Sequence, residues 1–218
     1  MSLALWLIAF ASAVTGGPAE AHPHLWIESR SDVLFDAEGA ITAVRHTWTF
    51  DEMYSAYAIQ GLDSDGDGML SRRELEPVNE ANVESLAEYE YFTFLRVVSD
   101  DPVQASFSAP TDSWTEFDGS VLSFQFTLPL EEPIDPARFK TGIDVFDPAY
   151  FVGFTFADDN PVRLVDAPEA CRSRTGRARG FDEAIAGKLA QIPATGELPP
   201  DLLDLTVTNA NTIRVICN

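Results

Sequence analysis

Apolar and polar residues alternate along two consecutive stretches near the start of the chain, residues 24–35 and residues 41–50. A period of two places every second side chain on one face of an extended segment, which is typical of a half-buried β-strand. The acidic, glycine-containing stretch 36–39 between them has the composition of a turn. The pattern therefore predicts a β-hairpin over residues 24–50.

The alternation stops at Asp51, which has the features of a helix N-cap. We expect one helix directly after it, then a loop, then a second helix that begins near Ser71 and ends near Tyr89. Pro77 should kink or restart the second helix, because proline has no N–H to donate and its ring clashes with the preceding turn. Residues 51–89 are therefore expected to form a helix–loop–helix insertion.

The rest of the chain is predicted to be mostly strand. Short β-runs are expected at residues 91–98, 103–108, 121–128, 145–156 and 212–217. Residues 172–180 should form a polar, arginine-rich surface loop, residues 181–192 a short helix and residues 193–200 a linker. The expected fold class is mainly β: a β-sandwich-like domain with an inserted helix–loop–helix and a short C-terminal helix.

The stretch 63–74 reads Asp-Ser-Asp-Gly-Asp-Gly-Met-Leu-Ser-Arg-Arg-Glu and matches the calcium loop of an EF-hand. The expected oxygen ligands are the side chains of Asp63, Asp65, Asp67, Ser71 and Glu74 and the backbone carbonyl of Met69. Gly68 falls at the sharp turn, and Leu70 should point into the core. An acidic surface turn that binds nothing is the alternative, but it does not require this combination of residues. The pattern therefore predicts a calcium site.

The chain has 218 residues, enough for one hydrophobic core. Its 14 basic and 35 acidic residues give a formal net charge of −21. This charge argues against nucleic acid or an anionic membrane surface as a partner, because both are polyanions. It suits cation binding or solubility in a salty medium.

Residues 1–21 have the features of an export signal. Residues 3–14 are almost wholly apolar, which matches a signal-peptide core and is too short to span a bilayer. The small-x-small pattern of residues 19–21 predicts cleavage after Ala21. The amino-terminal region lacks Lys and Arg, and an N-terminal anchor is the alternative. We expect an exported domain of residues 22–218 with no stable membrane insertion.

Cys171 and Cys217 are the two cysteines of the chain. In an exported protein such an even pair predicts a disulfide. No phosphate loop, nucleotide fingerprint or nucleophile motif is present in the sequence. No catalytic residue and no enzymatic activity are therefore predicted.

The three histidines are His22, His24 and His46. After cleavage the chain would begin with His22, whose free amine and imidazole together suit Ni²⁺, Co²⁺, Zn²⁺ or Cu²⁺. His24 lies two residues on, on the same side of an extended chain. His46 is the candidate third ligand, but the expected hairpin register pairs it with Ser29 on the apolar face, away from His24. A hydrogen-bonded core histidine at position 46 and a flexible terminus at 22–24 are the alternatives.

Six short motifs follow one another along the chain: Ala-His-Pro-His-Leu-Trp-Ile at 21–27, Trp-Thr-Phe-Asp-Glu-Met-Tyr-Ser at 48–55, the acidic loop, Tyr-Phe-Thr at 91–93, Phe-Thr-Leu-Pro-Leu at 126–130 and Asp-Pro-Ala-Tyr-Phe at 147–151. In this set the chain resembles a bacterial family of unknown function whose members are described as periplasmic components of an uncharacterised ABC-type transport system. The resemblance implies a periplasmic location and association with a nickel/cobalt or zinc permease of the inner membrane. It matches His22 and His24 to the family's His-Pro-His and residues 63–74 to its acidic loop.

The leading functional hypothesis is a periplasmic metal-binding accessory protein of a transition-metal transport system, with calcium in the acidic loop. The alternative is a calcium-stabilised binding or structural module with no transition-metal site. A third hypothesis is a copper enzyme in which His22 and a second histidine form a brace for oxidative chemistry. It is the least favoured hypothesis, because His24 is too close in sequence to His22 for its ring to turn back easily toward the terminal amine.

Overall fold

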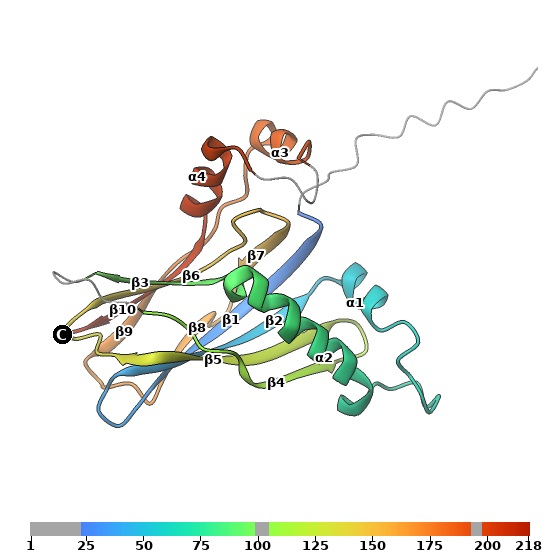
Figure 1. The fold of residues 1–218 in the computed structure, drawn as a ribbon, viewed down its shortest axis with the longest axis horizontal. Coiled ribbons are helices and arrows are strands. Elements are labelled where there is room, and N and C mark those ends of the chain that lie inside the picture. Colours follow the sequence, from blue (N-terminus) through green and yellow to red (C-terminus); the bar gives the residue numbers. More distant parts are fainter. Residues whose placement is uncertain (1–22, 99–104, 193–197) are drawn as a thin grey trace, which may run out of the picture.

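The computed structural model describes residues 23–98, 105–192 and 198–218, and within them two β-sheets dominate the molecule. The sheets lie against one another, with the helices at the margins (Figure 1). This arrangement confirms the expected mainly β fold class. In the described part of the chain, every helix is too short or too polar to cross a membrane.

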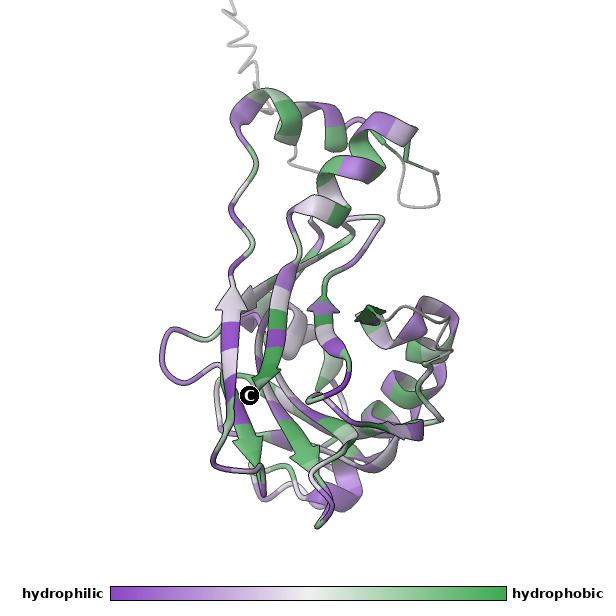
Figure 2. Cartoon of the chain, turned by 90° about the vertical axis from the view of Figure 1, so that its left-hand side faces the viewer, coloured by the Kyte–Doolittle hydropathy of each residue, from purple (hydrophilic) through white to green (hydrophobic). Residues whose placement is uncertain are grey.

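The predicted hairpin forms the centre of the larger sheet. Strand β1 (Leu25–Phe35) pairs antiparallel with β2 (Ile41–Phe50), and β5 (Leu122–Ile134) pairs with the other edge of β2. The outer positions are taken by β4 (Thr111–Phe117) beside β5, and by β7 (Val152–Phe156) and β8 (Val162–Val165), which both run parallel to β1. Green and purple bands alternate along the strands in Figure 2, as a period of two requires.

The smaller sheet has the order β3-β6-β10-β9. Its strands are β3 (Thr93–Val98), β6 (Lys140–Val145), β10 (Asn211–Cys217) and β9 (Cys171–Gly176), all antiparallel to their neighbours. Cys171 lies directly opposite Cys217 in the β9–β10 pair, and the two form the predicted disulfide.

Buried side chains form two clusters. One joins the two sheets and includes Val33 and Ile41 of the larger sheet with Ile143 and Ile213 of the smaller one. The other is aromatic: Trp48 is 1% exposed and is surrounded by the rings of Phe92, Phe124, Phe126 and Phe154. Burial of this much apolar surface from distant parts of the chain is the main stabilising contribution to the fold.

Five helical elements complete the chain within the described residues. They are α1 (Glu52–Ala58), α2 (Arg72–Leu86), the 3₁₀ helix η1 (Ala87–Phe92), α3 (Glu183–Leu189) and α4 (Pro200–Thr208). Helix α2 runs alongside the larger sheet, whereas α3 and α4 project together from one end of the molecule (Figure 1). Residues of α2 and of the loop before it pack on the aromatic cluster, so the insertion covers that cluster.

Several expectations about individual elements were wrong. His46 pairs with Ser31 and not Ser29, a shift of two residues. One residue of the shift arises because Phe35 pairs with Ile41 and not Ala40, and the irregularity at Leu34/Phe35 adds the other. Residues 172–180 do not form only a loop: most of β9 lies there, as a polar edge strand. Helix α2 continues through Pro77 without restarting. Strands β4, β6 and β8 and helix α4 were not anticipated, and the described part of the expected run 103–108 contains only one isolated bridge, at Phe107.

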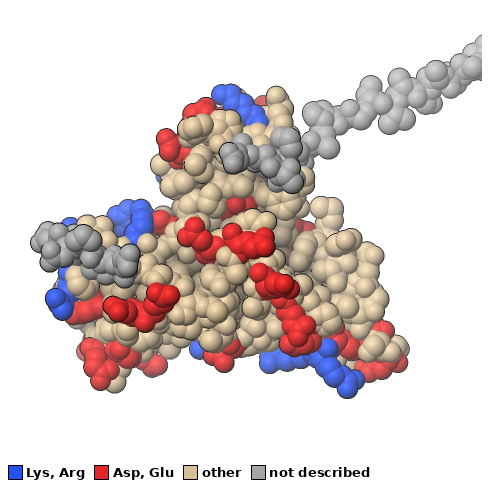
Figure 3. All heavy atoms as spheres, in the orientation of Figure 1, with Lys and Arg blue, Asp and Glu red and all other residues tan. Residues whose placement is uncertain are grey.

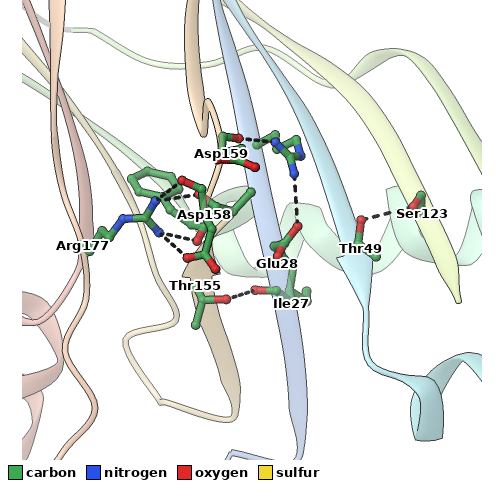
Figure 4. A network of polar contacts seen from close by, with 11 residues as sticks. Ile27, Glu28, Thr49, Ser123, Thr155, Asp158, Asp159 and Arg177 are labelled. Atoms are coloured by element: carbon green, nitrogen blue, oxygen red, sulfur yellow. Dashed lines mark hydrogen bonds and ion pairs between the residues drawn. The ribbon is translucent and has the colours of Figure 1, made fainter.

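Arg177, just after β9, ties that strand to the larger sheet. Its guanidinium donates to the backbone carbonyls of Phe156, at 2.6 Å, and Ala157, at 2.7 Å. Figure 4 shows this side chain beside Asp158, with Thr155 donating to the Ile27 carbonyl nearby. Strand carbonyls that would otherwise lack partners are thereby satisfied.

Candidate functional site

The candidate calcium loop is framed by two capped helices. The Asp51 side chain caps α1 by accepting from the Tyr54 N–H at 2.8 Å, as predicted, and its other oxygen accepts from the Trp26 N–H at 2.9 Å. Asp51 thus fixes the start of α1 to the first strand. At the other end of the loop, Ser71 caps α2 and forms a reciprocal capping box with Glu74.

Within the loop, three carboxylates converge. One oxygen each from Asp63, Asp65 and Asp67 lies within 4.8 Å of the other two, and all three residues are exposed. The loop is held by its own acidic side chains, since Asp63 accepts from the N–H groups of Gly66, at 2.8 Å, and Gly68, at 3.1 Å. Gly68 has a φ of +80°, a conformation that disfavours other residues at this turn.

This spacing fits Ca²⁺. Calcium–oxygen bonds are roughly 2.3–2.6 Å long, so two ligands of one ion lie at most about 5 Å apart. The three aspartate oxygens meet this limit, since all of them lie within 4.8 Å of one another. Hard carboxylate oxygens are also the donors that calcium prefers.

Glu74, the predicted bidentate ligand, lies outside this group. One of its oxygens accepts from the backbone N–H and the hydroxyl of Ser64, both at 2.8 Å, and the other accepts from the N–H and hydroxyl of Ser71. These hydrogen bonds, those from Ser71 first, lower the pKa of Glu74 to about 2 and keep it ionised. The same carboxylate thus joins the two ends of the loop, and direct coordination by Glu74 would compete with these bonds.

The remaining loop residues have distinct environments. Leu70 packs on the aromatic cluster, as expected. The side chain of Met69 is 70% exposed, which agrees with a role for its backbone carbonyl alone. The Ser71 hydroxyl donates to the Glu74 carboxylate and its oxygen accepts from the Glu74 N–H, which leaves one lone pair for a water or an ion.

The histidines lie in different parts of the molecule. His22 lies outside the described residues. His24 is exposed, its N–H donates to the Phe151 carbonyl at 2.8 Å, and its ring stacks on the Phe151 ring at 4.6 Å. His46 pairs with Ser31, seven residues along the chain from His24, which corresponds to about 23 Å along an extended strand. The structure therefore does not bring His24 and His46 together.

His46 is fully buried, and both of its ring nitrogens have hydrogen-bond partners. Nδ1 lies 3.0 Å from the Ser31 hydroxyl, and Nε2 lies 3.2 Å from Thr93 Oγ1. Because Thr93 donates its own proton to the Tyr91 carbonyl, Thr93 Oγ1 accepts from a protonated Nε2, and Ser31 donates to Nδ1. This is a neutral imidazole. Burial lowers the pKa of His46 to about 3, against a smaller opposite effect of the Asp32 carboxylate.

Sequence reasoning missed two features near these residues. The hydrogen-bonded trio of His46, Ser31 and Thr93 joins residues from three strands, and the pairing of β3 with β6 that positions Thr93 has no local signal. A cavity of about 400 Å³ also lies between the insertion and the sheet, lined by aromatic residues that include Trp48, Tyr89 and Phe151.

Comparison with known proteins identifies relatives without a known activity. A family model described as a protein of unknown function (DUF1007) matches residues 7–217. An uncharacterised protein of Haemophilus influenzae is 21% identical over 154 residues, which cover 71% of this chain and 72% of the relative.

Proposed function

We propose that this chain, which belongs to the DUF1007 family of proteins of unknown function, is a periplasmic metal-binding accessory protein of a transition-metal transport system. In this proposal a calcium ion in the loop 63–74 holds the helical insertion in shape. The observation that carries the calcium part is the convergence of three aspartate oxygens, each within 4.8 Å of the other two.

The charge of the loop supports a bound cation. Three exposed carboxylates held this close repel one another, and no basic side chain forms an ion pair with them in the described part of the chain. A divalent cation would convert this repulsion into attraction. The affinity expected for an extracellular module is weak, on the order of 10⁻⁴ to 10⁻³ M.

Calcium would act on the fold through the insertion. Leu70 lies inside the loop and Leu75 lies in the first turns of α2, and both belong to the packing around the aromatic cluster. An ion that holds the loop in one conformation would therefore also hold Leu70 and Leu75 in place against the cluster around Trp48. Because calcium would bind this loop only in the folded protein, adding calcium should raise the free energy of unfolding.

The transition-metal part of the proposal rests on the amino terminus. His24 is anchored beside Phe151 by its backbone N–H and by ring stacking. An imidazole only two residues from the expected mature amino terminus is thus held at a fixed place on the surface. Nitrogen ligands of this kind suit Ni²⁺, Co²⁺, Zn²⁺ or Cu²⁺, the first three of which match a transporter for nickel, cobalt or zinc.

Calorimetric titration of CaCl₂ into chelator-treated protein tests the loop. The variant Asp63→Asn/Asp65→Asn should abolish the binding heat. The control Asp158→Asn/Asp159→Asn makes the same change in net charge at two exposed carboxylates elsewhere, and it should bind like the wild type. Equal binding by the wild type and both variants would refute a site in the loop.

A calcium-stabilised module without a second metal is the alternative, and the burial of His46 favours it. With both ring nitrogens engaged in the core, His46 is no candidate for completing a site with His24 or a copper brace. Mass spectrometry of the exported protein, followed by titration with Ni²⁺, Co²⁺ and Zn²⁺, separates the two. A chain that begins at His22 and loses metal binding on His24→Gln supports the accessory role, whereas no binding by the wild type leaves only the calcium module.

A further inference from the structure

The outer face of the smaller sheet carries a row of basic side chains. The pairing register aligns Arg96 of β3, Gly142 of β6, Arg214 of β10 and Arg174 of β9 at one level across all four strands. The neighbouring level, Ile143 and Ile213, is fully buried against the larger sheet. Since side chains alternate along a strand, the three arginines point away from the core.

Gly142 interrupts this row. A Cβ atom at that position would lie 3.8 Å from two nitrogens of the Arg96 guanidinium, so the arginine extends over the place where a side chain would stand. Arg96 and Arg214 are two strands apart, which is roughly 10 Å. Because Gly142 has no side chain, the Arg96 guanidinium lies over β6, between its own strand and Arg214, so one ligand on this face can contact both arginines.

A cavity of about 650 Å³ opens at this end of the sheet. Its lining combines the basic residues Arg96, Arg138, Lys140 and Arg214 with the apolar residues Val98, Phe139 and Ile216. Basic groups at the rim of an apolar hollow suit a molecule that has an anionic group and an apolar body.

Basic side chains are concentrated here, although the whole chain is strongly acidic. Six of the chain's 14 basic side chains belong to this face or its edge: Arg96, Arg138, Lys140, Arg172, Arg174 and Arg214. Arg96 binds the buried Asp144 carboxylate at 2.5 Å, and Arg214 also interacts electrostatically with that carboxylate. The five basic residues other than Arg96 form no direct ion pair in the described part of the chain. Figure 3 shows Lys and Arg atoms gathered at the end of the molecule where β3 and β10 end.

Arg214 also lies directly opposite Arg174 in the β9–β10 pair. Like charges at directly opposed positions destabilise a sheet, and a bound anion would relieve this repulsion. The arginine fork matches the geometry of both carboxylate and phosphate oxygens.

We propose that this cavity binds a small organic oxyanion, a carboxylate or phosphate ester that carries an apolar group. The two guanidinium groups beside Gly142 and the Lys140 amine hold the anionic group, and Val98, Phe139 and Ile216 contact the apolar part. The net charge of −21 repels extended polyanions, so the ligand is a single small anion. The site shares no residue with the calcium loop or the histidines, and it stands independently of the function proposed above.

Calorimetric titration with phenyl phosphate and with octanoate, in buffer containing saturating calcium, tests the site. At least one probe should bind the wild type more tightly than inorganic phosphate does, and added NaCl should weaken the binding. Arg214→Gln and Lys140→Gln should each weaken it roughly ten- to a hundredfold, since each removes a charged hydrogen-bond donor. Lys188→Gln, which changes the chain's other lysine on α3, should bind like the wild type.

Vesicles containing phosphatidylglycerol distinguish a lipid headgroup from a free ligand. Sedimentation with these vesicles that is lost in Arg214→Gln supports the same site with a phosphate carried by lipid. Thermal melts confirm that the variants are folded. The proposal is overturned if neither soluble probe nor vesicles bind at millimolar concentration, or if binding persists in both Arg214→Gln and Lys140→Gln.

Discussion

The buried histidine should make the stability of this protein depend on pH in a defined window. His46 has a pKa lowered to about 3 in the folded protein, from a value of 6.5 in a solvated chain. Between these two values the unfolded chain binds a proton that the folded protein does not bind. The contribution of neutral His46 to the free energy of unfolding is therefore fully present above pH 6.5 and is lost as the pH falls toward 3.

The size of the effect follows from the shift. Each pKa unit corresponds to about 1.4 kcal/mol, so the loss attributable to His46 is about 2 kcal/mol near pH 5 and approaches about 5 kcal/mol below pH 3. Domains of this size are typically stable by about 5–15 kcal/mol, so even the smaller loss is measurable.

Urea unfolding of the wild type and of His46→Gln, at several pH values between about 7.5 and 4.5, measures this loss. Glutamine retains a donor and an acceptor for Ser31 and Thr93 but does not titrate. Between pH 7.5 and 5 the wild type should lose about 2 kcal/mol more than the variant. Parallel losses in the wild type and His46→Gln would refute the reasoning.

Two further changes probe the framework around the candidate sites. Cys171→Ser/Cys217→Ser opens a loop of 46 residues, and loop-closure entropy predicts a loss of about 4 kcal/mol in the free energy of unfolding. Denaturant midpoints of the oxidised wild type and the variant measure this loss. Equal midpoints would contradict the prediction. Asp51→Ala removes the N-cap of α1 and the acceptor of the Trp26 N–H, and should cost about 1–2 kcal/mol. The free energy of unfolding of Asp36→Ala gives a comparison with the loss of an aspartate at a turn remote from the insertion. An Asp51→Ala protein as stable as the wild type would contradict the conclusion that Asp51 fixes the start of α1 to the first strand.

Local patterns in the sequence were sufficient for the central hairpin and for the helices on either side of the acidic loop. The alternation in residues 24–50 reflects burial of one face, so the strands β1 and β2 could be located closely. Their register could not, because the irregularity at Leu34/Phe35 depends on local geometry that periodicity does not encode. The N-cap at Asp51 is a local hydrogen bond, so it could be predicted from the local sequence, as could the start of α2 near Ser71.

Edge strands and long-range contacts were harder to predict. Strand β9 reads as a polar loop because Arg172 and Arg174 lie on one of its faces, and Ser173 and Thr175 follow Cys171 on the other. It becomes a strand through pairing with β10, and a distant partner leaves no local signal. The position of Glu74 illustrates the same limit, since the motif predicts a metal ligand while the structure engages both oxygens with Ser64 and Ser71.

The most direct test of the account is the melting temperature of chelator-stripped protein with and without about 5 mM CaCl₂. For a dissociation constant of 10⁻⁴ to 10⁻³ M, linkage predicts about 1–2 kcal/mol of added stability and a rise of roughly 2–9 °C. Asp63→Asn/Asp65→Asn should not respond, and Mg²⁺ at the same concentration should have a smaller effect on the wild type. An unchanged melting temperature for the wild type in calcium would contradict the proposal that this ion holds the insertion in place.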